Sequence, residues 1–227
     1  MNANIFKSAI AALALLVGIN FFGCNSKPQE NTTNTTVTET CNSNLQISAN
    51  DKLEIEKLFR DMIEWEINDT IHIDLVPVIA NENKSKYIGV DLQKLEITAQ
   101  KLKNTGFFSQ TFIDNYKRLI TELDRKMRNN EFEEWLVGEL PPFRFANDVS
   151  PFFNSQETAP VDSICFLSEN PKNVEVKWFS KFPDTNGNMQ ITVMGKCHFE
   201  KEQGCWKISY LPGFNYEDGI KIDGEIE

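Results

Sequence analysis

The chain has 227 residues, and its 33 acidic residues outnumber 23 lysines and arginines, giving a formal net charge of -10. Few basic residues are therefore available to replace the counterions of a phosphate backbone, which argues against a nucleic-acid-binding protein. Hydrophobic residues make up 41% of the chain and aromatic residues 11%, enough to bury a core and to argue against a wholly disordered protein. One globular domain is the expectation for this length.

The first 23 residues have the pattern of an export signal. Lys7 precedes a largely apolar run over residues 9–22, which is too short to span a bilayer comfortably and is typical of the hydrophobic region of a signal peptide. The run ends at Gly23 and Cys24, which resembles the bacterial lipoprotein signal, where the cysteine is lipidated and becomes the first residue. Phe22 departs from the small or aliphatic residue usual there. An ordinary signal peptide or an apolar anchor with an incidental cysteine is the alternative.

Residues 24–46 are predicted to form a flexible tether. Val37 is the one aliphatic residue in the Asn- and Thr-rich stretch 25–44, so this segment cannot bury enough surface to become ordered. Asn25, in place of Asp after the cysteine, resembles proteobacterial lipoproteins that are sorted to the outer membrane. The tether lacks the dense acidic run that resembles surface-export signals of Bacteroidetes. We therefore expect an outer-membrane lipoprotein that faces the periplasm and reaches the membrane through its lipid anchor.

Three amphipathic helices are predicted to begin the body of the chain. Residues 48–51 offer a capping box, and apolar residues then recur at helical spacing to about residue 68. A second helix is predicted over residues 91–104 and a third over 110–128, capped by Ser109. The third helix has a stripe expected to face the core: Phe112, Ile113, Tyr116, Leu119, Ile120, Leu123 and Met127.

The segments around these helices are less regular. Residues 70–80 alternate β-branched residues but contain Pro77, so a short strand and a helix start both stay open. Residues 132–160 are rich in Phe and Pro. Their prolines disfavour a regular helix or central strand, so this segment is predicted to pack its aromatic side chains onto the core as an irregular arm.

The last part of the body is predicted to form strands. Residues 161–167 are a short strand candidate, and residues 174–182, 189–199 and 205–211 alternate with turn clusters between them. Consecutive strands with short turns form an antiparallel meander. The sequence therefore predicts an α+β protein, with one globular domain over residues 47–214 and an acidic tail over 215–227.

Two segments carry a family resemblance. Residues 105–116 (TGFFSQTFIDNY) and 146–157 (ANDVSPFFNSQE), within a helices-then-meander order, look like small secreted or lipid-anchored proteins of the NTF2-like (cystatin-like α+β) class. The resemblance implies N-terminal helices packed on a C-terminal curved antiparallel sheet, with a cone-shaped cavity at its open end. That scaffold hosts isomerases, dehydratases, transport factors and binding modules, so the fold does not name an activity.

The cysteines suggest one disulfide. With Cys24 lipidated, Cys41, Cys165, Cys197 and Cys205 allow three pairings. Cys197 and Cys205 flank a turn between neighbouring strands, so we predict that they are bonded. Strand alternation points Cys197 inward and Cys205 outward, and a bulge in the turn would have to reconcile the two faces. Two free thiols are the alternative.

Candidate pocket residues are Asp148, Gln156, Trp178, His198, Trp206 and Tyr210. Asp148 and Gln156 flank the Pro-Phe-Phe sequence at residues 151–153, where they either line a pocket or fasten the arm by hydrogen bonds. Trp178, Trp206 and Tyr210 belong either to the core or to a surface that binds a ligand. His198 is a candidate base, but no nucleophile motif accompanies it, so a solvated histidine is favoured. No catalytic residue, cofactor or metal site is predicted.

Three functions follow as hypotheses. The first is a lipid-anchored periplasmic binding or interaction domain without catalysis, with a protein partner or a small apolar ligand. The second is a small-molecule carrier or enzyme that uses the cone cavity, which aromatic side chains filling that cavity would exclude. The third is a protective, immunity-type protein that binds a basic toxin, since an acidic surface complements a basic partner.

Overall fold

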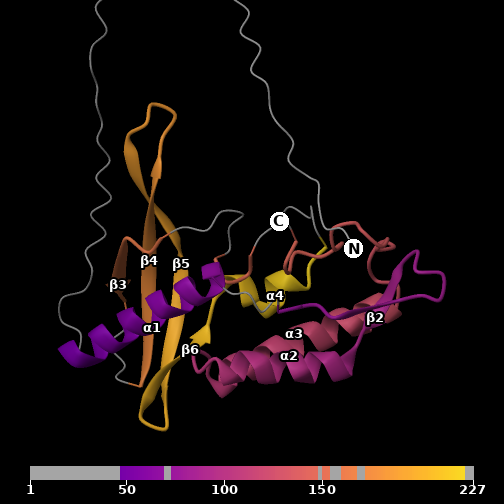
Figure 1. Ribbon diagram of the computed structural model, residues 1–227, viewed down its shortest axis with the longest axis horizontal. Coiled ribbons are helices and arrows are strands. Elements are labelled where there is room, and N and C mark those ends of the chain that lie inside the picture. Colours follow the sequence, from indigo (N-terminus) through magenta and orange to yellow (C-terminus); the bar gives the residue numbers. More distant parts are fainter. Residues whose placement is uncertain (1–46, 69–72, 148–149, 154–159, 168–171, 223–227) are drawn as a thin grey trace, which may run out of the picture. The chain divides into compact units, whose positions relative to one another are not determined.

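The computed structural model describes residues 47–68, 73–147, 150–153, 160–167 and 172–222 (Figure 1). They all belong to one compact unit, Thr40–Glu227. The predicted signal, lipidation site and tether lie outside the described residues, as do Asp148 and Gln156. No helix in the described part of the chain has the length and apolar character that crossing a bilayer requires.

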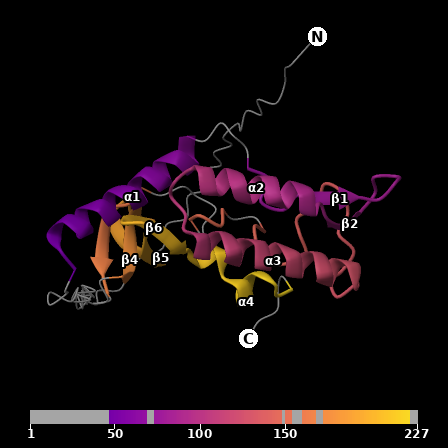
Figure 2. The same cartoon turned by 90° about the horizontal axis from the view of Figure 1, so that it is seen from below.

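The three predicted helices are present. They are α1 (Ala49–Asn68), α2 (Leu92–Asn104) and α3 (Gln110–Arg128). Each begins where a side chain satisfies free backbone N–H groups. Ser48 Oγ accepts from the N–H of Asp51 at 3.0 Å, and Ser109 caps α3 by accepting from the N–H of Phe112. Helices α2 and α3 pack side by side (Figure 2).

The predicted meander is an antiparallel four-stranded sheet. Its strands are β3 (Ser163–Phe166), β4 (Asn173–Pro183), β5 (Met189–Glu202) and β6 (Cys205–Tyr210), in that spatial order. With the helices before it, this curved sheet confirms the predicted α+β class. A second, two-stranded sheet pairs β1 (Val78–Ala80) with β2 (Tyr87–Val90). Strand β1 resolves the open choice over residues 70–80, and β2 was not predicted.

Aromatic side chains fill the space between α1 and the sheet. Phe59 of α1 meets Trp178 of β4 edge-on, with ring centroids 5.5 Å apart, and Phe199 of β5 at 6.0 Å. All three side chains are buried. The apolar stripe of α1 thus packs against the inward residues of the alternating strands.

The arm after α3 packs onto this core as predicted. Its buried rings are Phe132, Phe143, Phe145, Phe152 and Phe153. Phe152 contacts Phe214, which belongs to the 3-10 helix η1 (Pro212–Phe214), with centroids 5.0 Å apart. A short helix, α4 (Tyr216–Gly219), follows, and its Gly219 is buried. The packed part of the chain therefore continues past the predicted domain boundary at residue 214.

The predicted Cys197–Cys205 disulfide is wrong, because both cysteines are free. Gln203 and Gly204 form a two-residue turn with positive φ at both positions, so Cys205 lies opposite Glu202. Cys197 lies five residues before Glu202 in β5, about 16 Å of strand away and well beyond disulfide reach. The strand alternation correctly predicted that the two cysteines lie on opposite faces of the sheet, since Cys197 is buried and Cys205 is exposed. Cys165 is the disulfide-bonded cysteine among the described residues.

Candidate binding groove on the sheet

A row of three functional side chains crosses the outer face of the sheet. Glu175 of β4, His198 of β5 and Tyr210 of β6 are direct cross-strand partners, and such partners share a face. His198 Nε2 lies 3.7 Å from Glu175 Oε2, and the His198 and Tyr210 ring centroids are 4.9 Å apart. Phe199, the next residue along β5, is buried on the opposite face against α1.

This row forms the floor of a groove of about 560 Å³, which we call the sheet groove. Its lining residues come from the first turns of α3 and from three strands of the sheet: Thr111, Asn115, Asn173, Val174, Glu175, His198, Glu200, Ser209 and Tyr210. Hydroxyl, amide and carboxylate groups therefore supply the hydrogen-bonding sites of a groove whose exposed surface is otherwise mostly apolar.

Backbone hydrogen bonds place α3 beside the sheet. The N–H of Ser109, the residue that caps α3, donates to the carbonyl oxygen of Ile208 at 2.9 Å. The N–H of Ile208 in turn donates to the carbonyl oxygen of Phe107 at 2.9 Å. Because these bonds extend the sheet by one short segment, the first turn of α3 stands next to Ser209 and Tyr210.

The residues after β6 hold the groove walls in place. Asn115 Nδ2 donates to the carbonyl oxygen of Phe214 at 2.8 Å, which ties α3 to η1. Asn215 Nδ2 lies 3.2 Å from the hydroxyl oxygen of Tyr210 and donates to it. The phenol of Tyr210 is therefore fixed from one side by Asn215 and from the other by its contact with His198.

The carboxylates of the groove differ in their neighbours. Glu175 Oε1 forms an ion pair with Lys196 Nζ at a distance of 2.8 Å. Glu200 has no ion-pair partner within the part of the chain that the structure describes. The groove thus keeps one carboxylate without an ion pair, that of Glu200, beside the aromatic pair His198 and Tyr210.

The structure brings two of the six candidate pocket residues together. His198 and Tyr210 meet in the sheet groove, whereas Trp178 and Trp206 are buried elsewhere. Trp178 packs on Phe59, and Trp206 Nε1 donates to Asp51 Oδ1 at 2.7 Å, so both serve the interface with α1. Asp148 and Gln156 lie outside the described residues.

Sequence reasoning missed Glu175, Glu200 and the contribution of α3. The turn cluster at residues 183–188 was a usable signal for the register, because counting residues away from it along both strands pairs β4 with β5. Such a count fails at Met194, which has no partner in β4, because Phe179 pairs with Val193 and Trp178 pairs with Gly195. This bulge shifts the register by one residue, and only the folded sheet shows that Glu175 faces His198.

The groove is suited to binding a polar or cationic group. No group of three or more His, Cys, Asp and Glu side chains in the described ranges could hold a metal ion. Among the same residues, His198 has no hydroxyl or thiol as a hydrogen-bond donor that it could activate. Carboxylates beside aromatic rings attract cations through both charge and ring quadrupole.

No protein-family model, curated protein or solved structure matches this chain. Function is therefore argued from the groove itself rather than from relatives.

Proposed function

We propose that this protein is a lipid-anchored binding domain of the bacterial cell envelope, which holds a basic partner in the sheet groove without catalysing a reaction. The observation that carries the proposal is the row Glu175, His198 and Tyr210 with Glu200 beside it, with His198 exposed and the other three partly exposed on one sheet face. A lysine or arginine side chain of a partner fits this set because it can pair with Glu200 while it contacts the aromatic rings.

Charge supports a basic partner. The chain carries a formal net charge of -10, so its field attracts a cationic surface and speeds the encounter at low ionic strength. An immunity-type protein that neutralises a basic toxin is one form of this proposal. The groove favours that form over a nucleic-acid or acidic partner, which Glu175 and Glu200 would repel.

The sequence supports the location. A signal that ends at Cys24 and a tether to residue 46 would place the domain at the periplasmic face of the outer membrane. The NTF2-like resemblance remains part of this proposal. The carrier or enzyme alternative has less support, because Phe59, Trp178 and Phe199 occupy the space between α1 and the sheet.

A peptide titration tests the groove. Pentalysine added to the ¹⁵N-labelled domain at low ionic strength should shift the resonances of His198, Ser209 and Tyr210. Glu175→Gln with Glu200→Gln should weaken binding by about three- to tenfold, as expected for losing the ion pair with Glu200 and the longer-range attraction of Glu175. The matched control is Glu82→Gln with Glu217→Gln, which removes the same charge from exposed sites outside the groove.

Equal weakening by both double variants would mean that net charge alone attracts the peptide. That result, or shifts that spread over the whole surface, would refute the sheet groove as the binding site.

A further inference from the structure

A second cavity, of about 410 Å³, lies between strand β2, the last turn of α3 and the start of the arm. It shares no lining residue with the sheet groove. Its apolar lining consists mainly of Tyr87, Met127, Phe132 and Trp135. Two cationic side chains, Arg128 and Lys86, also line it. The volume falls within the range of ligand pockets, about 300 to 1,000 Å³. We call this cavity the hairpin pocket.

Two aromatic rings of the hairpin pocket are held rigidly. Tyr87 and Trp135 have ring centroids 4.6 Å apart, and the N–H of Tyr87 donates to the carbonyl oxygen of Trp135 at 2.9 Å. Trp135 Nε1 donates to the carbonyl oxygen of Glu139 at 2.9 Å. The buried ring of Phe143 supports Trp135 from behind, with centroids 5.4 Å apart. The aromatic wall therefore exists before any ligand arrives.

Arg128 is fixed by a buried carboxylate while its outer nitrogens stay available. Its Nε contacts both carboxylate oxygens of Asp124 at 2.9 Å, and Asp124, which is 8% exposed, also accepts from the N–H of Val90 at 2.7 Å. The guanidinium lies over Gly89, where a Cβ would come within 2.8 Å of Nη2. Neither Nη nitrogen has a hydrogen-bond partner among the described residues.

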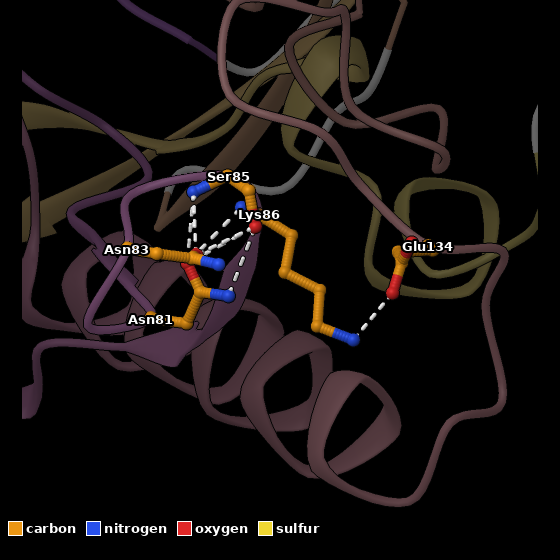
Figure 3. Close-up of polar contacts among 5 residues, drawn as sticks. All are labelled: Asn81, Asn83, Ser85, Lys86 and Glu134. Carbon is orange, nitrogen blue, oxygen red and sulfur yellow. Dashed lines mark hydrogen bonds and ion pairs between the residues drawn. The ribbon is translucent and has the colours of Figure 1, made fainter.

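The other cation of the pocket is already neutralised. Lys86 Nζ is paired with Glu134, as Figure 3 shows. The Asn81 side chain fixes the adjoining turn by accepting from the backbone N–H groups of Ser85, at 2.9 Å, and Lys86, at 3.3 Å (Figure 3). This leaves Arg128 as a donor, Glu133 as an acceptor and the Asn130 amide as both, with no side-chain hydrogen bonds to one another.

We infer that the hairpin pocket binds a neutral saccharide. Each sugar hydroxyl both donates and accepts, which matches unpaired donors and acceptors around one cavity. The apolar C–H face of a pyranose ring packs on an aromatic face such as that of Trp135. A simple carboxylate fits less well, because Arg128 is already paired with Asp124 and Lys86 with Glu134, and the carboxylate of Glu133 also lines the pocket. An ammonium ligand would be repelled by the positively charged guanidinium of Arg128, which Asp124 holds in place.

The test is an NMR titration of the ¹⁵N-labelled protein with a fixed panel: methyl β-glucoside, N-acetylglucosamine, cellobiose, 3-phenylpropionate and phenethylammonium. At least one sugar should shift the Trp135 indole N–H and the Tyr87 amide saturably, with a dissociation constant of about 1 to 10 mM. Trp135→Ala should abolish the shift of the Tyr87 amide, the reporter that this variant retains. Tyr210→Ala, which alters the sheet groove, should leave sugar binding unchanged and so separates this inference from the proposed function.

If Trp135→Ala does not fold, Arg128→Gln tests the same inference. It should weaken sugar binding by about tenfold, because it removes a charged hydrogen-bond donor. Arg118→Gln, on the same helix but outside the pocket, should have no effect. The inference is overturned if no sugar shifts Trp135, if Arg118→Gln weakens binding as much as Arg128→Gln, or if the carboxylate or ammonium probe binds more tightly than every sugar.

Discussion

Asp51 ties the first turn of α1 to the far strands of the sheet. Its Oδ1 accepts from Lys201 Nζ and from Trp206 Nε1, both at 2.7 Å, and Ser48 Oγ donates to Oδ2 at 2.8 Å. These hydrogen bonds, above all the one from Lys201, lower the pKa of Asp51 to about 2. One carboxylate thus holds the capping side chain of Ser48 and joins α1 to two strands, which explains why Trp206 is structural.

Asp51→Asn should lower the free energy of unfolding at pH 7 by about 1 kcal/mol, a value reduced for partial solvent screening. Because the folded pKa lies below the unfolded value of 3.8, the stabilisation is complete above the unfolded value. It is lost as the pH falls from about 5 toward 2. Urea unfolding of both proteins across this range measures the effect.

The difference between wild type and Asp51→Asn should therefore narrow in acid. Asp61→Asn is the control, since Asp61 forms an exposed pair with Lys57 on the same helix and should change stability by less than about 0.5 kcal/mol. A gap that widens as the pH falls would contradict the assigned role of Asp51.

The two free thiols should differ in reactivity. Cys197 is fully buried, and burial raises the pKa of its thiol, whereas Cys205 is exposed at the start of β6. Iodoacetamide at pH 8 should label Cys205 in the folded protein and Cys197 only after unfolding, because the reactive thiolate must reach solvent. Peptide mapping by mass spectrometry reads both sites. A Cys197–Cys205 bond in that map would show that the β5–β6 register is different.

At the scale of elements, α3 connects the regions that define both proposed sites. Its first turn borders the sheet groove and its last turn the hairpin pocket. The core-facing side chains in its middle, among them Tyr116, Leu119 and Ile120, are fully buried. Leu119 lies close to Gly219, where a Cβ would come within 3.0 Å of Leu119 Cδ1. The packing of this one helix therefore sets the positions of both cavities.

Leu119→Ala should reduce stability by about 2 to 5 kcal/mol, the cost of deleting a large buried side chain and leaving a cavity. Leu53→Ala is the matched control, because Leu53 is 67% exposed on α1 and should cost less than about 0.5 kcal/mol. Denaturant midpoints of the two variants give the comparison. Similar midpoints would mean that α3 presents a different face to the core.

The sequence predicted regular elements well and polar exceptions poorly. The bounds of α3 followed from the Ser109 cap and the 3-4 spacing of its apolar residues. Asp124 is nevertheless buried on that helix, while Met127 of the predicted stripe is only half-buried. Asp124 turns inward because its carboxylate binds the N–H of Val90 on β2, a partner 34 residues away that helical periodicity cannot reveal.

At the scale of the whole molecule, long-range pairing decided what the sequence could not show. Strand β2 has four residues including Gly89, so its local pattern is weak, and its edges are fixed by β1 and by the arm through the Lys86–Leu136 bridge. The sheet groove likewise needs three strands and α3 in register. His198 and Tyr210 were recognisable as functional residue types, but their carboxylate neighbours depended on that register.

The proposed lipid anchor at Cys24 determines where the whole molecule resides. Cys24→Ser should move the protein from the membrane fraction to the soluble fraction of the producing bacterium, because the substitution removes the proposed acylation site. Each buried CH₂ of an acyl chain contributes about 0.8 kcal/mol, and the Asn- and Thr-rich tether offers no apolar surface to replace it. Cys205→Ser is the matched control, since Cys205 is free and exposed and should leave the partition unchanged.

Immunoblots of both fractions, with radiolabelled palmitate incorporated into the wild type, measure attachment and lipidation separately. Lipid label on wild type but not on Cys24→Ser, together with the shift in fraction, is the expected result. Equal membrane partition of the two proteins would contradict the lipoprotein assignment and favour an uncleaved apolar anchor over residues 9–22. The peptide titration of the sheet groove, performed on the isolated domain, would stand unaffected by that outcome, because the groove lies within the folded unit Thr40–Glu227.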